Sequence, residues 1–212
     1  MNRCFNSSRA LPTPPAVQAR LDARRDHVLE AAVGLLSREG YGGCSVAAIA
    51  AEAGISTGSV YQSFAGKSEL AAALFRTLVA RELEAVAACA DLPGTAAHRV
   101  AAAVEIFASR ALQAPRRAFA LLAEPADPAV DTERLVFRRA FRDVYAAQIA
   151  AGVASGELPR QSPELTAAAL VGAIAEALVG PLADGDADPG EVIPGLITFT
   201  LRALGGHDAA DA

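Results

Sequence analysis

The chain has 212 residues, 52% of them hydrophobic, and a formal net charge of −5. This length fits one sizeable domain or two small ones, and the alanine-rich, proline-punctuated segments favour an all-α protein of about nine helices. The negative net charge argues against a protein that coats nucleic acid without regard to sequence.

Residues 1–20 contain three closely spaced prolines, and we interpret them as a flexible basic arm. Two interpretations of this arm stay open. It is either an untethered tail, or Arg20, Arg24 and Arg25 contact phosphates or a minor groove, as basic arms beside DNA-reading helices can.

The charge is distributed unevenly along the chain. Residues 1–25 carry five arginines and one acidic residue, whereas residues 71–212 carry 12 arginines and 18 acidic residues. The positive charge is therefore concentrated at the end of the chain where attraction to phosphate would need it.

An amphipathic helix is expected over Asp22–Glu39, because apolar residues recur at helical spacing. The residues of its apolar face are Val28, Leu29, Ala32, Leu35 and Leu36. Three glycines end this helix, and Ser45 is placed to cap the next one.

Residues 45–64 have the pattern of two short helices joined by a glycine turn. Ala50 is small enough for two helices to cross closely, and Gly54 stands where the turn needs left-handed backbone. Val60 and Phe64, four residues apart, would bury the second helix. This spacing is typical of a helix-turn-helix, whose second helix lies in the major groove of DNA, although an ordinary αα-hairpin is the alternative.

The flanks of this motif extend the pattern. The matching positions over residues 24–70 are an apolar first helix closed by Gly40-Tyr41, then Ser45, Ile49-Ala50, Ala53-Gly54-Ile55-Ser56, Tyr61, Phe64, Lys67 and Leu70. With these residues the segment resembles the N-terminal domain of the TetR family of bacterial repressors. The resemblance implies a DNA-binding domain over 21–66 with its motif at 45–64 and an effector-binding and dimerisation domain over 67–205. Residues 206–212 are expected to form a disordered tail.

The second motif helix would turn its polar side chains toward base edges. Lys67 is the only lysine of the chain, and the resemblance implies that it opens the next helix with its side chain at the DNA backbone. A solvated surface lysine is the alternative. The expected DNA-binding residues are Arg24, Arg25, Ser45, Ser56, Thr57, Gly58, Ser59, Tyr61, Gln62, Ser63 and Lys67.

The chain also departs from the family. Relatives often carry basic residues where this chain has Ala47 and Ala48, and bulkier residues at Thr57 and Ser63. Fewer phosphate contacts follow, so we expect weak nonspecific affinity for DNA.

Six further helices are expected after the motif, punctuated by proline and glycine. Their approximate ranges are 67–90, 95–113, 116–123, 131–155, 163–182 and 191–204. Because a helix-turn-helix pair reads two half-sites, the protein is expected to be a homodimer on a palindromic operator. The last two helices are the candidates for that interface. The alternative is that they fill the core of a monomer. The predicted interface residues are Leu165, Ala169, Gly172, Glu176, Ile193, Leu196, Ile197 and Leu201.

Six of the 11 aromatic residues fall in residues 71–160, where the resembled family places its effectors. Aromatic rings beside a few polar groups suit a small-molecule site, although plain core is the alternative. The predicted pocket residues are Phe107, Arg110, Phe137, Phe141, Tyr145 and Gln148.

No catalytic, metal or cofactor site is predicted. The three histidines are solitary, and the three cysteines are odd in number and widely spaced. The apolar run 165–182 approaches the length of a membrane span, but Glu176 interrupts it, so we expect a cytoplasmic protein. The sequence thus predicts a ligand-responsive repressor. A thiol-responsive regulator using Cys44 or Cys89, or a helical enzyme, is the alternative.

Overall fold

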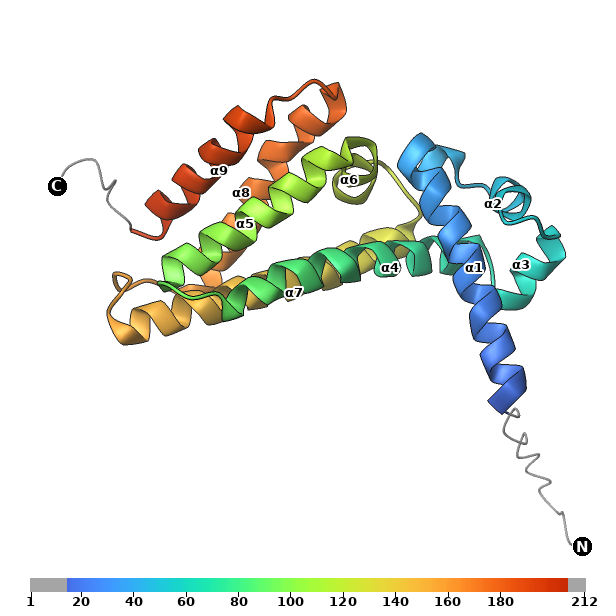
Figure 1. Cartoon of the computed structure of the whole chain (residues 1–212), viewed down its shortest axis with the longest axis horizontal. Coiled ribbons are helices and arrows are strands. Elements are labelled where there is room, and N and C mark those ends of the chain that lie inside the picture. Colours follow the sequence, from blue (N-terminus) through green and yellow to red (C-terminus); the bar gives the residue numbers. More distant parts are fainter. Residues whose placement is uncertain (1–14, 206–212) are drawn as a thin grey trace, which may run out of the picture.

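The structure is a computed structural model that describes residues 15–205, and within them it contains nine α-helices and no strand. The chain forms a small N-terminal head and an elongated helical body (Figure 1). The helices of the head are α1 (Pro15–Glu39), α2 (Val46–Glu52) and α3 (Thr57–Ser63). Those of the body are α4 (Lys67–Ala87), α5 (Ala96–Gln113), α6 (Pro115–Leu122), α7 (Pro128–Ser155), α8 (Pro163–Asp184) and α9 (Pro189–Ala203). Short 3-10 turns lie at Tyr41–Gly43 and Ala88–Asp91. The predicted all-α fold is confirmed.

The first helix starts earlier than expected. Pro15 occupies its first position, where a missing N–H leaves no intrahelical bond unmade. Residues 15–20 are therefore helical, which corrects the expectation of a flexible arm over 1–20. Residues 1–14 and 206–212, which include the rest of that arm and the predicted tail, lie outside the described residues. The first turns of α1 project from the head (Figure 1), and its core contacts begin at Val28.

The helix-turn-helix forms at α2 and α3. Ser45 and Ser56 cap the two helices, each accepting a hydrogen bond from the backbone N–H three residues on. Gly54 has φ 65°, and the N–H of Ile55 donates to the Ala50 carbonyl at 3.0 Å across the turn. Ala50 is buried where the helices cross. Ser45 and Ser56 therefore cap the helices, Gly54 makes the turn and Ala50 allows the close crossing, as the sequence pattern predicted.

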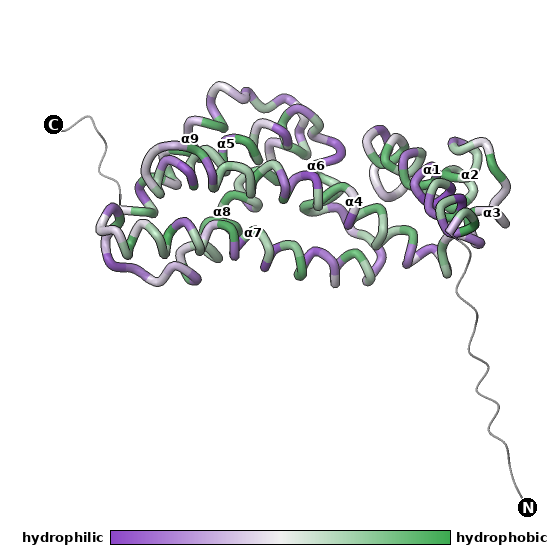
Figure 2. Tube along the Cα trace, turned by 60° about the horizontal axis from the view of Figure 1, so that its bottom comes forward, coloured by the Kyte–Doolittle hydropathy of each residue, from purple (hydrophilic) through white to green (hydrophobic). Residues whose placement is uncertain are grey.

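Packing around shared apolar residues joins the head to the body. One buried cluster links α1, α2 and α3 to α4, and a second lies among α5, α7, α8 and α9. Phe141 of α7 packs against both clusters. Apolar and polar residues alternate along the helices in Figure 2, as expected for amphipathic helices around a common core.

Two long helices of the body, α4 and α7, lie side by side (Figure 1). Arg76 of α4 and Glu133 of α7 form an ion pair at 2.5 Å between them. Asp127 caps α7, and Pro128 occupies its first position, so that this helix begins a few residues before the predicted start. The helix ends at Gly156, which has φ 81°.

Candidate functional site

The outer surface of α3 carries four exposed residues of the predicted DNA-binding set. They are Thr57, Gly58, Tyr61 and Gln62. Tyr61 is 56% exposed, so its ring and hydroxyl are available to a partner. A ligand lying against α3 would meet these four residues first.

The four serines of the set have partners within the head. Ser45 and Ser56 accept the capping bonds, the hydroxyls of Ser56 and Ser59 lie 2.9 Å apart, and the Ser63 hydroxyl donates to the Ser59 carbonyl. These bonds fix the ends of α2 and α3. A hydroxyl retains further hydrogen-bonding capacity, so contact of these serines with DNA stays a prediction.

Arg24 orients the longest polar side chain of α3. Its Nη1 donates to Gln62 Oε1 at 2.8 Å, which connects α1 to α3. Because Arg24 engages the amide oxygen, the amide nitrogen of Gln62 and its two N–H donors remain for other partners. The pair therefore forms one polar unit at the head surface.

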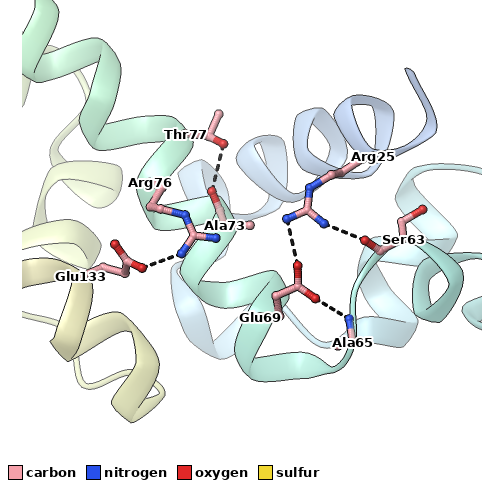
Figure 3. A network of polar contacts seen from close by, with 8 residues as sticks. All are labelled: Arg25, Ser63, Ala65, Glu69, Ala73, Arg76, Thr77 and Glu133. Atoms are coloured by element: carbon pink, nitrogen blue, oxygen red, sulfur yellow. Dashed lines mark hydrogen bonds and ion pairs between the residues drawn. The ribbon is translucent and has the colours of Figure 1, made fainter. Parts of the chain in front are cut away.

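Arg25 lies at the junction of α1, α3 and α4 (Figure 3). Its guanidinium donates to the Ser63 carbonyl at 2.6 Å and to Glu69 at 3.0 Å, and it covers the Phe64 ring at 4.1 Å from the centroid. A hydrogen bond from the Ala65 N–H, followed by that from Arg25, lowers the pKa of Glu69. Arg25 therefore holds the end of α3 against α4, and its contact with DNA stays a prediction.

Lys67 is exposed at the first position of α4, immediately beyond the end of α3. A helix N-terminus of this length favours an anion, and the lysine adds a full positive charge. Asp127 accepts from the Ser68 hydroxyl at 2.8 Å, which joins the same end of α4 to α7. The Ala129 N–H, the Ser68 hydroxyl and the Lys67 charge lower the pKa of Asp127.

A cavity of about 90 Å³ lies in the body between α4, α5, α6, α7 and α8. Aromatic rings form much of its wall. Phe75 and Phe137 meet edge to face at 5.8 Å between centroids. Phe107 and Phe141 meet in the same way at 5.7 Å. The predicted pocket residues that line the cavity are Phe107, Arg110, Phe137, Phe141 and Tyr145.

Gln148 does not line this cavity. It shares the helix face of Phe141 but lies two turns, or about 10 Å, further along α7. Its side-chain oxygen accepts from Arg99 Nε at 2.7 Å and so connects α7 to α5. Gln148 is therefore a structural residue in the free subunit.

Four charged residues of the cavity wall were missed by the sequence analysis. They are Glu82, Arg117, Arg134 and Arg138. The spacing of Arg134, Phe137, Arg138 and Phe141 on one side of α7 was the signal that could have revealed two of them. Glu82 pairs with Arg110 through two hydrogen bonds of 2.5 and 3.1 Å, and this pairing raises the pKa of Arg110.

Polar contacts from Arg116 of α6 and from Glu124, two residues after that helix, connect the body to the head. Glu124 accepts from the backbone N–H of Tyr41 at 3.2 Å and of Gly42 at 3.5 Å. Arg116 donates to the Glu39 carbonyl at 2.8 Å and lies 3.7 Å from the Glu124 carboxylate. Since α6 also lines the cavity, a single short helix contacts both the cavity and the head.

The predicted interface residues of α8 all lie on its outer surface. Leu165, Ala169, Gly172 and Glu176 are exposed, and Leu165 is 72% exposed. Within residues 15–205, α8 is also the one helix whose length and composition would suffice to cross a bilayer. Its exposed apolar surface explains why it passes that test and equally suits a helical partner.

The predicted interface residues of α9 are less available. Leu196 is buried in the core of the subunit, which corrects its assignment to an interface. Ile193 is half-buried, and Ile197 and Leu201 line a groove against α5. The exposed apolar residue of this helix is Phe199. An apolar stripe was correctly located on α9, but much of it packs against its own subunit.

The two cysteines of the described residues are poor candidates for a thiol sensor. Cys44 donates to the Gly40 carbonyl at 3.3 Å, and burial raises its pKa to about 11. Cys89 is buried, and burial raises its pKa as well. Because the thiolate is the reactive form, the burial that raises the pKa of each thiol lowers its reactivity near neutral pH.

We expect Cys44 and Cys89 to resist alkylation in the folded protein. At pH 8 iodoacetamide should label each of them at least about tenfold more slowly than in protein unfolded by urea, because burial suppresses the thiolate. Peptide mass spectrometry at timed intervals measures each site separately. Equal rates for Cys44 in the two states would restore the thiol-responsive alternative.

Comparisons with known proteins agree with this geometry. Residues 28–74 match the family model of bacterial regulatory proteins, tetR family. No curated protein matches the chain. A TetR-like transcriptional regulator from Rhodococcus sp. RHA1 has a similar structure, with a TM-score of 0.66 and 26% identity over 92% of this chain and 100% of that one.

Two further structures are similar over most of their length. The regulator FadR from Bacillus subtilis, solved with stearoyl-CoA, has a TM-score of 0.74 and 18% identity over 84% of this chain and 98% of its own. SmeT, solved with triclosan, has a TM-score of 0.73 and 20% identity over 88% and 93%. Residues 28–74 of this chain therefore match the tetR family of bacterial regulatory proteins, and the whole chain has the fold of TetR-like transcriptional regulators.

Proposed function

We propose that the protein is a homodimeric, cytoplasmic repressor that binds a palindromic operator and leaves it when a small molecule enters the cavity. One observation carries this proposal. A single helix, α4, begins beside α3 at Lys67 and lines the cavity through Phe75, Val79 and Glu82. One helix thus extends from the surface that would meet DNA to the cavity that would hold a ligand.

The surface of α3 suits a major groove. Its exposed polar residues can meet base edges, and the amide of Gln62 has the geometry that reads adenine. Lys67 and the N-terminus of α4 would meet the backbone phosphate. In this arrangement Gln62 supplies sequence preference and Lys67 supplies affinity for any duplex.

The cavity is connected to the head by two routes. The first is α4, whose N-terminal end is joined to α7 by the bond between Ser68 and Asp127. The second is α6, through Arg116 and Glu124. A ligand that favours a different placement of these helices would change operator affinity about 5–150-fold for a coupling of about 1–3 kcal/mol. The stearoyl-CoA and triclosan bound to similar proteins support a small molecule as the signal.

The outer surface of α8 supports the dimer. It combines exposed small and apolar residues with open space above Gly172 and Gly180, so a second copy of the helix could approach closely. To read two half-sites, such a dimer would have to hold its two α3 helices about 34–36 Å apart, or a multiple of that distance.

The proposal is tested by separating base recognition, assigned to Gln62, from phosphate contact, assigned to Lys67. An operator is first selected from random DNA duplexes with the wild-type protein. Lys67→Ala should then weaken binding to selected and random duplexes alike and lower the salt slope by about 1. Gln62→Ala should instead change the preferred base at one position of each half-site, by about 1–3 kcal/mol of discrimination. Titration of fluorescent duplexes at several salt concentrations measures both effects.

Glu52→Ala is a control, because this exposed residue on α2 pairs with Arg38 and is not among the predicted DNA contacts. It should leave the base preference unchanged. Equal losses on selected and random duplexes for both Lys67→Ala and Gln62→Ala would contradict the division, and failure to select any duplex would contradict the function.

A further inference from the structure

We propose that the ligand of the cavity is an organic acid, with an apolar body among the aromatic rings and a carboxylate held by Arg117 and Arg138. The inference rests on the proposed function for the biological role of the cavity but not for its chemistry. The inference is based on which arginines of the cavity wall already have hydrogen-bond or ion-pair partners and which do not.

The apolar part of the site is defined by its rings. Phe107 and Phe141 form one edge-to-face pair, Phe75 and Phe137 form another, and Tyr145 closes the wall. Surfaces of this kind bind an apolar group of about the size of one ring or a short chain. These rings alone would not distinguish a neutral ligand from a charged one.

The charged part of the wall is strongly positive. Four arginines and one acidic residue line the cavity, in a chain whose net charge is −5. Arg110 is neutralised by Glu82, with which it shares two hydrogen bonds. A cationic ligand would therefore meet an excess of like charge in the remaining wall.

Arg134 is also occupied. Its guanidinium donates to the carbonyls of Leu121, Ala120 and Glu124 and to the carboxylate of Asp131. These bonds hold α7 against the end of α6. Arg134 thus serves the fold and has few donors left for a ligand.

Arg117 of α6 and Arg138 of α7 remain. Both line the cavity, and within residues 15–205 neither forms a hydrogen bond or ion pair with another side chain or with the backbone. A guanidinium matches a carboxylate in two parallel hydrogen bonds, and such charge-assisted bonds are stronger beside apolar walls than in water. They belong to two different helices that both line the cavity, so one carboxylate held by both would connect α6 to α7.

The test uses matched probes that differ only in their head group. The probes are 4-phenylbutanoate, 4-phenylbutan-1-ol and 4-phenylbutylamine, together with octanoate, octan-1-ol and octylamine. Isothermal titration of the full-length protein should give at least one carboxylate that binds about tenfold or more tightly than its alcohol, with the amine weakest. The carboxylate preference should fall to about threefold or less in the Arg117→Gln, Arg138→Gln double variant.

Binding of the alcohol is the measure of an intact cavity, and it should be unchanged in the double variant. Arg139→Gln is the control, because Arg139 is the neighbouring exposed arginine of α7 and does not line the cavity. It should keep the full carboxylate preference. Equal binding of acid and alcohol, a preference that survives the double variant, or no binding by any probe up to about 10 mM would overturn the inference.

Release of a selected operator by the same probes separates this inference from the proposed function. A carboxylate that binds without releasing the operator would support the ligand class and contradict the ligand-responsive repressor. Release of the operator by an alcohol or amine, with no preference for the carboxylate, would support the ligand-responsive repressor and contradict the ligand class.

Discussion

Gly172→Arg should convert the protein to a monomer and remove specific operator binding. Gly172 lies on the exposed surface of α8, and no heavy atom lies within 4 Å of the position that a Cβ would occupy. The arginine therefore fits the isolated subunit, and the change from glycine favours the helix by about 1 kcal/mol. In a dimer packed through this surface the same side chain would place a charge between two closely approaching helices.

Light scattering coupled to gel filtration measures the mass, and titration of a selected duplex measures binding. We expect half the wild-type mass and a loss of affinity of at least about 100-fold, because a single head can engage only one half-site. Ala80→Arg, at an exposed position of α4, adds the same side chain elsewhere and should stay dimeric. A dimeric Gly172→Arg variant, or a monomeric wild type, would refute the proposed interface.

Gly40→Val should be the most destabilising substitution at the junction of head and body. Gly40 is buried and has φ 71° and ψ −167°, a backbone conformation that is nearly restricted to glycine. A Cβ would also lie 2.5 Å from Arg116 Nη2 and would overlap the carboxylate of Glu124. These side chains can move aside only by giving up their contacts with the head.

The expected loss is about 2 kcal/mol or more in the free energy of unfolding, the sum of backbone strain and lost contacts. For a protein of this size it corresponds to a fall in melting temperature of about 4 °C or more. Calorimetry provides the measurement. Gly42→Val is the matched control, since it lies in the same turn without positive φ and with nothing within 4 Å of a new Cβ. Equal losses in the two variants would show that the special conformation of Gly40 is not responsible.

Local patterns predicted the helices and the motif well. Proline at helix starts and glycine at helix ends act within a few residues of themselves, so the sequence alone located most boundaries. The helix-turn-helix was predictable for the same reason, because Ala50, Gly54 and Val60 have roles set by size and backbone freedom. The early start of α1 was missed because three nearby prolines indicated an arm, although Pro15 is compatible with a first helical position.

Long-range pairing was not predictable in this way. The ion pair of Arg25 was not predictable from local spacing, because its partner Glu69 lies 44 positions further along the chain. Leu196 belongs to a helical apolar stripe, and such a stripe has the same spacing whether it faces a core or a second subunit. Gln148 lies on the face of α7 that carries Phe141, but it lies two turns too far along the helix axis to line the cavity. Which partner covers a given face depends on the tertiary arrangement, which periodicity does not contain.

Because α4 extends from the cavity to the head, a small tilt of this helix at the cavity would become a larger displacement at the head. Glu82 at the cavity and Lys67 at the head are 15 residues apart on it, a separation of about 22 Å at 1.5 Å per residue. A tilt of about 5° around the cavity end moves the head end by about 2 Å, and two such arms in a symmetric pair change the distance between their tips by up to about 4 Å. Hydrogen bonds to bases tolerate only a few tenths of an ångström. In the proposed dimer, an angular change of this size would therefore be sufficient to take both α3 helices out of register with their grooves.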